Sequence, residues 1–196
     1  PTSDSVINAT TSTVTDVFTI QATDSNGTGN GTLTITINGV NDTPVLTAPT
    51  SATYTDTSAT DTFSNTTGTL SASDRDTGAT LSYGISSGTT GGSTSIGGVI
   101  YDVSKAGTYG TLYVVSTGAD KGKYVYVPTS SAINALTSST TDTFTVSSSD
   151  GNLSNTQTLT VNITGVNDTP TAANKTITIN EDTPTLLTVS DFGFID

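Results

Sequence analysis

The 196-residue chain contains no cysteine, no histidine and no tryptophan. Without cysteine, no disulfide can stabilise the fold. Without histidine or cysteine, the many serines and threonines lack the base that activates a hydroxyl nucleophile. Glu181 is the single glutamate, and although paired aspartates can serve a glycosidase, those found here lie in predicted turns. We therefore expect no enzymatic activity.

Charge is scarce and mostly of one sign. Charged residues make up 11% of the chain, and five basic residues face seventeen acidic ones, giving a net charge of −12. This excess excludes nucleic-acid binding through a basic surface and also argues against binding to anionic lipid. No apolar run approaches the roughly 20 residues of a membrane span, so we expect no direct membrane insertion. No signal peptide is recognisable, and we interpret the chain as an excerpt from a longer protein.

What the chain does contain is a strand pattern. Hydrophobic residues amount to 32%, but they alternate with Thr, Ser, Gly and Asn in short runs, as in half-buried strands. Gly, Asn, Asp and Ser clusters separate these runs, which is typical of all-β proteins. Many short strands at this spacing predict a two-sheet Greek-key β-sandwich.

A hexapeptide, Gly-Val-Asn-Asp-Thr-Pro, occurs at residues 39–44 and again at 165–170, an offset of 126 residues. Repetition at such a distance indicates a tandem array. The similarity extends over residues 1–44 and 128–170. It pairs Ile7 with Ile133, Asp16 with Asp142, Phe18 with Phe144, Asp24 with Asp150, Leu33 with Leu159, Ile35 with Val161 and Ile37 with Ile163. In both copies an alternating strand leads into the hexapeptide, so we interpret the hexapeptide as a joint between domains.

Three units follow from this repeat. Residues 1–44 form the C-terminal third of one repeat, residues 45–170 form a complete repeat, and residues 171–196 begin a further, truncated one. The first unit alone offers no second sheet to pack on and is marginal as an isolated fold. Either its upstream part has been removed or a neighbouring chain completes it.

Within the complete repeat we predict a series of strands and one helical turn. Ile133 and Leu136 lie on one side of the turn, at 131–136, and residues 84–98 form a loop. In the last unit, 174–179 and 185–189 read as strands. Core aromatics are expected at Phe18, Tyr83, Tyr109 and Phe144. The predicted strands of the complete repeat are 51–56, 67–73, 79–86, 95–103, 108–116, 122–127, 141–149 and 156–164.

Four blocks of the complete repeat match a known pattern in order. They run from Gly68 to Tyr83 (GTLSASDRDTGATLSY), from Tyr109 to Leu112 (YGTL), from Asn134 to Leu136 (NAL) and from Asp142 to Val146 (DTFTV), and the hexapeptide at 165–170 closes the repeat. Together they resemble the VCBS repeat of large bacterial RTX-type surface adhesins. The segment Asn180-Glu181-Asp182-Thr183-Pro184, with Asp191-Phe192-Gly193-Phe194, resembles the start of a related cadherin-like repeat.

The resemblance implies cadherin-like, Ig-like β-sandwiches in tandem, secreted or at the cell surface, with a role in cell adhesion or biofilm. It implies a stalk whose joints bind Ca2+, with neighbouring repeats of the same chain as partners. At the first joint the matching ligands are Asn41 and Asp42 in the linker, Asp74 and Asp76 in an Asp-x-Asp, and Asp150. At the second joint they are Asn167 and Asp168, with Asp56 and Asp102 as possible donors from the complete repeat. Asp24, the counterpart of Asp150, would face a joint upstream of residue 1.

Three readings compete with this one. Asn, Asp and Gly are ordinary turn residues, so the hexapeptide is also an acceptable turn without metal. Open sheet edges invite strand addition, so an alternative is that identical chains exchange strands to build an extracellular filament. Direct binding of a glycan, through residues 84–98, finds little support in a chain without tryptophan.

Overall fold

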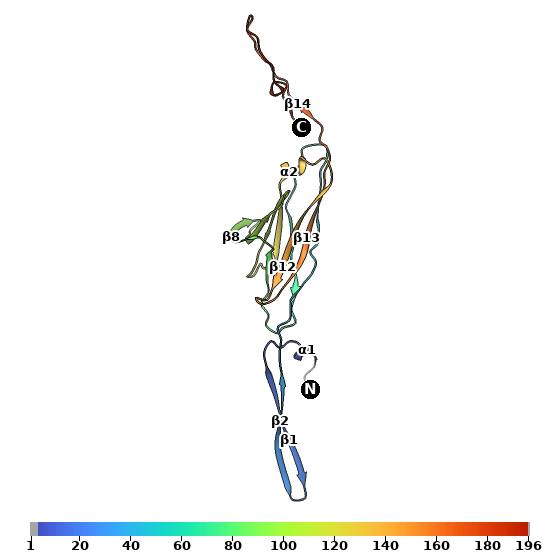
Figure 1. The fold of residues 1–196 in the computed structure, drawn as a ribbon, viewed down its shortest axis with the longest axis vertical. Coiled ribbons are helices and arrows are strands. Elements are labelled where there is room, and N and C mark those ends of the chain that lie inside the picture. Colours follow the sequence, from blue (N-terminus) through green and yellow to red (C-terminus); the bar gives the residue numbers. More distant parts are fainter. Residues whose placement is uncertain (1–3, 196) are drawn as a thin grey trace.

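The computed structural model describes residues 4–195 of the chain, which form an elongated, almost entirely β molecule (Figure 1). A hairpin of two long strands, β1 (Val14–Asp24) and β2 (Gly27–Ile37), lies at one end and follows the short helix α1 (Asp4–Ile7). A β-sandwich occupies the middle. The last segment extends from its far end and contains only β14 (Thr171–Ala172), η1 (Val189–Asp191) and β15 (Phe194–Ile195).

Two sheets form the sandwich, which confirms the all-β prediction. The first sheet has the order β4 (Ala52–Thr55), β13 (Ser154–Thr164), β12 (Thr140–Ser149), β7 (Ser82–Ile85), with β4 parallel to β13. The second has the order β5 (Thr66–Thr69), β11 (Lys123–Pro128), β10 (Gly110–Val114), β9 (Val99–Ala106), β8 (Thr89–Ile96). The chain crosses between the sheets after β4, β5, β7 and β11, so each sheet holds strands from distant parts of the sequence.

The core lies between these sheets and follows the alternation of the sequence. In β12 every second residue from Asp142 to Ser148 is buried, while the residues between them point outward, as the pleat of a strand requires. Tyr126 and Phe144 pack at the centre with ring centroids 5.8 Å apart. The helical turn predicted near 131–136 is confirmed as α2 (Ser130–Asn134), whose Ile133 is fully buried against the core.

Two strands of two residues each, β3 (Val45–Leu46) and β6 (Ala72–Ser73), pair antiparallel at the hairpin end of the sandwich. Leu46 and Leu70 are buried beside them and belong to the same core. This pairing fixes the linker after β2 alongside the chain that follows β6, and so sets up the geometry of the first joint.

The β1–β2 hairpin repeats the register of β12–β13 but not its burial. Phe18 pairs with Leu33 as Phe144 pairs with Leu159. Tyr83 and Phe144 are buried and Tyr109 packs on the core, as predicted, whereas Phe18 is 43% exposed. The prediction of a core position for Phe18 is therefore wrong in the described structure, because no second sheet covers the hairpin there.

Other strand predictions need correction. The predicted strand 95–103 is wrong, since Gly97 and Gly98 form a two-residue turn between β8 and β9, and the predicted loop 84–98 contains β8. Residues 67–73 divide into β5 and β6. No strand is assigned at 174–179 or 185–189 in the described residues, where an alternating pattern finds no neighbouring strand to pair with.

Candidate metal centre

Three aspartates converge at the hairpin end of the sandwich. Asp74 and Asp76 follow β6, and Asp150 follows β12, in the turn to β13. Each can place one carboxylate oxygen within 4.8 Å of the others. The three residues could therefore hold a metal ion. They are the three carboxylates for which the family resemblance implied a shared site, together with the linker residues.

Asn41 and Asp42 complete this group from the linker side. The Asn41 side-chain amide donates a 2.8 Å hydrogen bond to Asp150 Oδ2 and a 3.1 Å bond to the backbone carbonyl of Asp42. The backbone N–H of Asp42 donates to Asp76 Oδ2 at 2.7 Å. The linker thus reaches both ends of the carboxylate cluster, and β3–β6 pairing a few residues further on holds it there.

Two oxygens of the cluster are buried without a partner. Asp76 is only 7% exposed. Asp74 Oδ2 and Asp76 Oδ1 accept no hydrogen bond from the described residues, while Asp74 Oδ1 accepts one from the backbone N–H of Asp76 at 2.9 Å. A buried carboxylate oxygen without a donor is energetically costly. A cation between these oxygens would remove that cost, so the residues present fit a metal.

Local hydrogen bonds keep Asp150 ionised. Its Oδ1 accepts 2.7 Å bonds from the backbone N–H groups of Leu153 and Asn152, and these bonds, followed by that from Asn41, lower the pKa of the Asp150 carboxyl below its ordinary value. Bonds that favour the charged form have this effect. The turn therefore presents a carboxylate, the form that a cation requires.

The first residues of the chain contact the segment next to the cluster. The backbone N–H of Thr77, next to Asp76, donates a 3.0 Å hydrogen bond to the carbonyl of Ala9. Gly39 packs so tightly on the backbone of Thr10 and Ser12 that a Cβ there would collide with it. Ala9 and Thr10 were not predicted from the sequence as residues of the joint. The glycine at both 39 and 165 was the available signal, since a glycine is typical of close backbone approach.

The second joint repeats the linker geometry. The Asn167 amide donates to the carbonyl of Asp168 at 3.0 Å, as Asn41 does to Asp42, and Gly165 packs on Leu136 and Ser138, the counterparts of Thr10 and Ser12. Asp168 Oδ1 is buried without a hydrogen-bond partner among the described residues. A cavity of about 350 Å³ adjoins Asn167 and Asp168.

Asp56 lies at this second joint. It is 1% exposed, its N–H donates to Thr164 O at 2.9 Å, and Val166 N–H donates to its Oδ2 at 3.4 Å. Its Oδ1 has no hydrogen-bond partner in the described chain. The structure thus brings Asp56 to the hexapeptide, although it belongs to no group of three carboxylates among residues 4–195.

Asp102 and Asp24 lie elsewhere. Asp102, in β9, accepts hydrogen bonds from the backbone N–H and the hydroxyl of Ser116. Ser116 in turn bonds Tyr83, which pairs with Ser148 near the hairpin end of the sandwich. The structure therefore does not bring Asp102 to the second joint. Asp24 caps the β1–β2 turn through the N–H groups of Asn26 and Gly27, as Asp150 caps its own turn.

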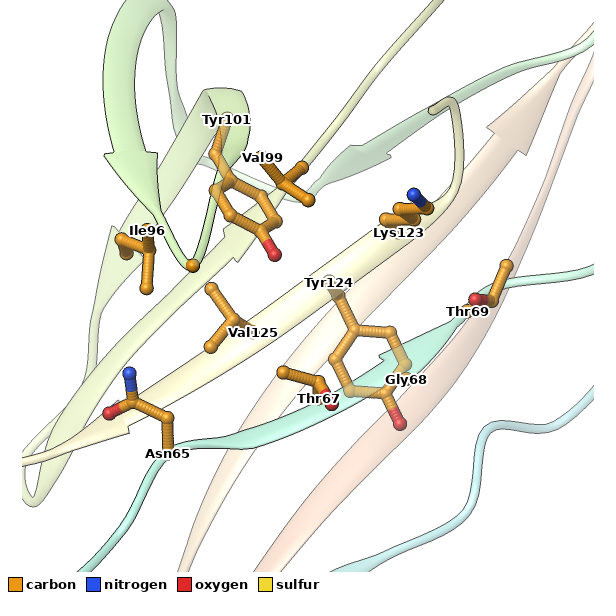
Figure 2. Close-up of a pocket in the computed structure, with 11 residues that line it drawn as sticks. Asn65, Thr67, Gly68, Thr69, Ile96, Val99, Tyr101, Lys123, Tyr124 and Val125 are labelled. Atoms are coloured by element: carbon orange, nitrogen blue, oxygen red, sulfur yellow. The ribbon is translucent and has the colours of Figure 1, made fainter. Parts of the chain in front are cut away.

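A larger cavity, of about 500 Å³, is lined by residues of the five-stranded sheet and includes none of the candidate metal ligands (Figure 2). The Tyr101 hydroxyl points into it above Val125, and Lys123 at its edge is paired with Asp120 at 2.6 Å. None of its lining residues carries a carboxylate, so it offers neither a cation site nor a paired acid and base. They are Asn65, Thr67, Gly68, Thr69, Ile96, Gly97, Val99, Tyr101, Lys123, Tyr124 and Val125.

No protein-family model and no curated protein matches this chain. The solved structure of an endo-fucoidan hydrolase, MfFcnA4 from glycoside hydrolase family 107, aligns with 79% of this chain at 17% identity and a TM-score of 0.31. The chain spans 19% of that enzyme, and so distant a likeness says nothing about activity. No helix among the described residues is both long and apolar enough to cross a bilayer.

Proposed function

We propose that this chain is a non-catalytic extender of an extracellular adhesive protein, stiffened by Ca2+ at its inter-domain joints. The observation that carries the proposal is the meeting of Asp74, Asp76 and Asp150 beside the linker residues Asn41 and Asp42. The likeness of the sequence to VCBS and cadherin-like repeats supports an extracellular, adhesive or biofilm setting.

The donor set favours calcium among the common metals. Every candidate ligand is an oxygen, from a carboxylate, an amide or the backbone, and the chain has no histidine or cysteine for softer ions. Ca2+ takes about six to eight oxygens in flexible geometry. The unpartnered oxygens of Asp74 and Asp76 would bind it directly, and a flip of the Asn41 amide would present its oxygen in place of its nitrogen.

Such an ion would stiffen the joint by tying the linker to the sandwich that follows it. Asn41 and Asp42 belong to the linker, whereas Asp74, Asp76 and Asp150 belong to the following sandwich. Without a cation, the close carboxylates repel one another, and the hydrogen bonds from Asn41, Asp42 and Thr77 hold the joint alone. With a cation, the charges are neutralised and linker and sandwich share one set of ligands. Extracellular modules bind Ca2+ with dissociation constants of about 10⁻⁴–10⁻³ M, so the joint would be filled outside cells.

The test combines calcium binding with small-angle scattering on the full chain. We expect a Kd in that range and a longer, stiffer particle with millimolar Ca2+ than with chelator. The double variant Asp74→Asn/Asp76→Asn should bind Ca2+ at least about tenfold more weakly, because affinity follows ligand charge, and should scatter like the chelated protein.

The matched control is Glu181→Gln/Asp182→Asn. It removes the same charge from exposed positions outside the cluster and should leave affinity and scattering unchanged. Unaltered affinity in the Asp74/Asp76 variant would refute the metal assignment. A chain that binds Ca2+ but keeps one scattering profile would refute the stiffening alone.

A further inference from the structure

One face of the β1–β2 hairpin is apolar and uncovered. Phe18 and Ile20 on β1 share this face with Leu33 and Ile35 on β2, because Phe18 lies opposite Leu33 and Ile35 lies opposite Asp16. The four side chains are 43–54% exposed. Contiguous exposed apolar side chains of this kind mark an interaction surface.

The internal repeat shows what covers such a face. The counterparts Phe144, Val146, Leu159 and Val161 are at most 1% exposed. They pack in one cluster with side chains that come from the 45–127 part of the sandwich, namely Tyr54, Leu112, Val114 and Tyr126. The same pattern of side chains, in the same strand register, thus has a known complement within this molecule.

The edges of the hairpin define the complement further. The edge of β12 that faces away from β13 pairs antiparallel with β7 over Val146–Ser149. The edge of β13 that faces away from β12 pairs parallel with β4 over Val161–Thr164. The counterparts in the hairpin are residues 20–23 and 35–38. In the described chain β1 and β2 pair only with each other, so both edges remain open to strands in these two orientations.

A polar position also corresponds between the two hairpins. Asp142 in β12 is buried and accepts hydrogen bonds from Tyr109 N–H at 3.0 Å and from the Tyr126 hydroxyl at 3.3 Å. The hairpin carries Asp16 at the equivalent position, on the same face as Phe18. A complement built like residues 45–127 would bring a hydroxyl and a backbone N–H to this position as well.

We propose that the β1–β2 hairpin docks a half-sandwich built like residues 45–127, which adds one parallel and one antiparallel strand to it. The occupant is not a second copy of this chain, because in each copy the 45–127 half is already covered by β12 and β13. The inference rests on the hairpin and its internal counterpart and is independent of calcium.

The experiment adds the half-sandwich to the chain and measures hydrogen exchange of the hairpin amides. A second copy of residues 45–127 is joined ahead of Pro1 of the full chain. Pro1-Thr2-Ser3 matches Pro128-Thr129-Ser130, so the join reproduces the repeat apart from one extra residue, Asp4. Hydrogen exchange should show protection of the 20–23 and 35–38 amides about a hundredfold or more above that in the 196-residue chain, since edge amides gain partners and the face gains a core.

Two substitutions in the joined chain sharpen the result. Phe18→Asp, on the docking face, should abolish the gain in protection. Val17→Asp, on the opposite face and equivalent to the exposed Thr143, should preserve it. Absence of the gain in the joined chain overturns the proposal. Concentration-dependent association of the 196-residue chain that protects the same amides also overturns it, because a second copy would then be the occupant.

Discussion

At the scale of single residues, Asp142 is a buried polar group that connects separate parts of the sandwich. It is a carboxylate within the core, 7% exposed, and it ties the β9–β10 connection to β12 through Tyr109 N–H and the Tyr126 hydroxyl. Gly107 sits directly against its side chain, where a Cβ would collide. The residue therefore positions a loop as well as satisfying two donors.

Replacement of Asp142 by alanine should lower the free energy of unfolding by about 2–3 kcal/mol, because the buried Tyr126 hydroxyl and the part-buried Tyr109 N–H both lose their acceptor. Urea denaturation monitored by tyrosine fluorescence measures this. Asp16→Ala, at the equivalent position of the hairpin, is the control and should leave the sandwich transition in place. Equal effects of the two substitutions would contradict a role specific to the sandwich core.

At the scale of elements, the β8–β9 hairpin forms the outer edge of the five-stranded sheet and projects from the sandwich (Figure 1). Its turn is Gly97-Gly98, with Ile96 opposite Val99 and positive φ at both glycines, 59° and 83°. Turns with two positive φ values match the twist of a hairpin and favour Asn-Gly. An irregularity between Thr90 and Thr94 interrupts the pairing further along.

Gly98→Val should weaken this hairpin by about 1–3 kcal/mol, because a β-branched residue is strained at positive φ. Hydrogen exchange of the β8 amides, faster in the variant, is the measurement. Gly97→Asn should be neutral, since asparagine tolerates the left-handed conformation. If Gly97→Asn opened the hairpin as much as Gly98→Val, the assigned turn would be incorrect.

At the scale of the whole molecule, tyrosines buried in the sandwich connect its stability to pH. Burial raises the pKa values of Tyr54, Tyr101, Tyr124 and Tyr126 above the ordinary 10.0, and for Tyr126 the neighbouring Asp142 raises it further. Unfolding would expose these phenols to water, where they ionise at their ordinary value. The native state therefore retains protons that the unfolded state releases.

The contribution of these tyrosines to stability should thus be constant below about pH 10 and fall above it. The stabilising contribution is complete below the unfolded pKa and is lost as pH rises toward the folded values, with a slope of about 1.4 kcal/mol per pH unit for each tyrosine protonated only in the native state. Urea denaturation from pH 8 to 11.5 tests this. Tyr126→Phe should be less stable near neutrality but show a shallower alkaline slope, and an identical slope would argue against Tyr126 as a source.

Local pattern was sufficient for most of the architecture. Strands β12 and β13 were predictable because apolar side chains recur at every second residue, as burial of one face of a strand requires. The turn α2 was predictable because its apolar side chains are three residues apart, on one face of a helix. The β8 strand was missed for the same reason. Its Thr, Gly and Ser residues lie at an exposed edge and carry no alternation, so Gly97-Gly98 could be read equally as part of a strand.

The candidate metal residues at the first joint were named from a family resemblance, since nothing in the spacing of Asp74, Asp76 and Asp150 brings them together. Their convergence depends on β3–β6 pairing and on the end of β12, which only the folded sandwich provides. The same holds for the placement of Asp102 away from the second joint and for the exposure of Phe18. The repeat, the strands and the apolar faces are set by neighbouring residues along the chain, whereas the cover of each face and the partners of each carboxylate come from segments far apart in sequence, so tertiary packing alone decided them.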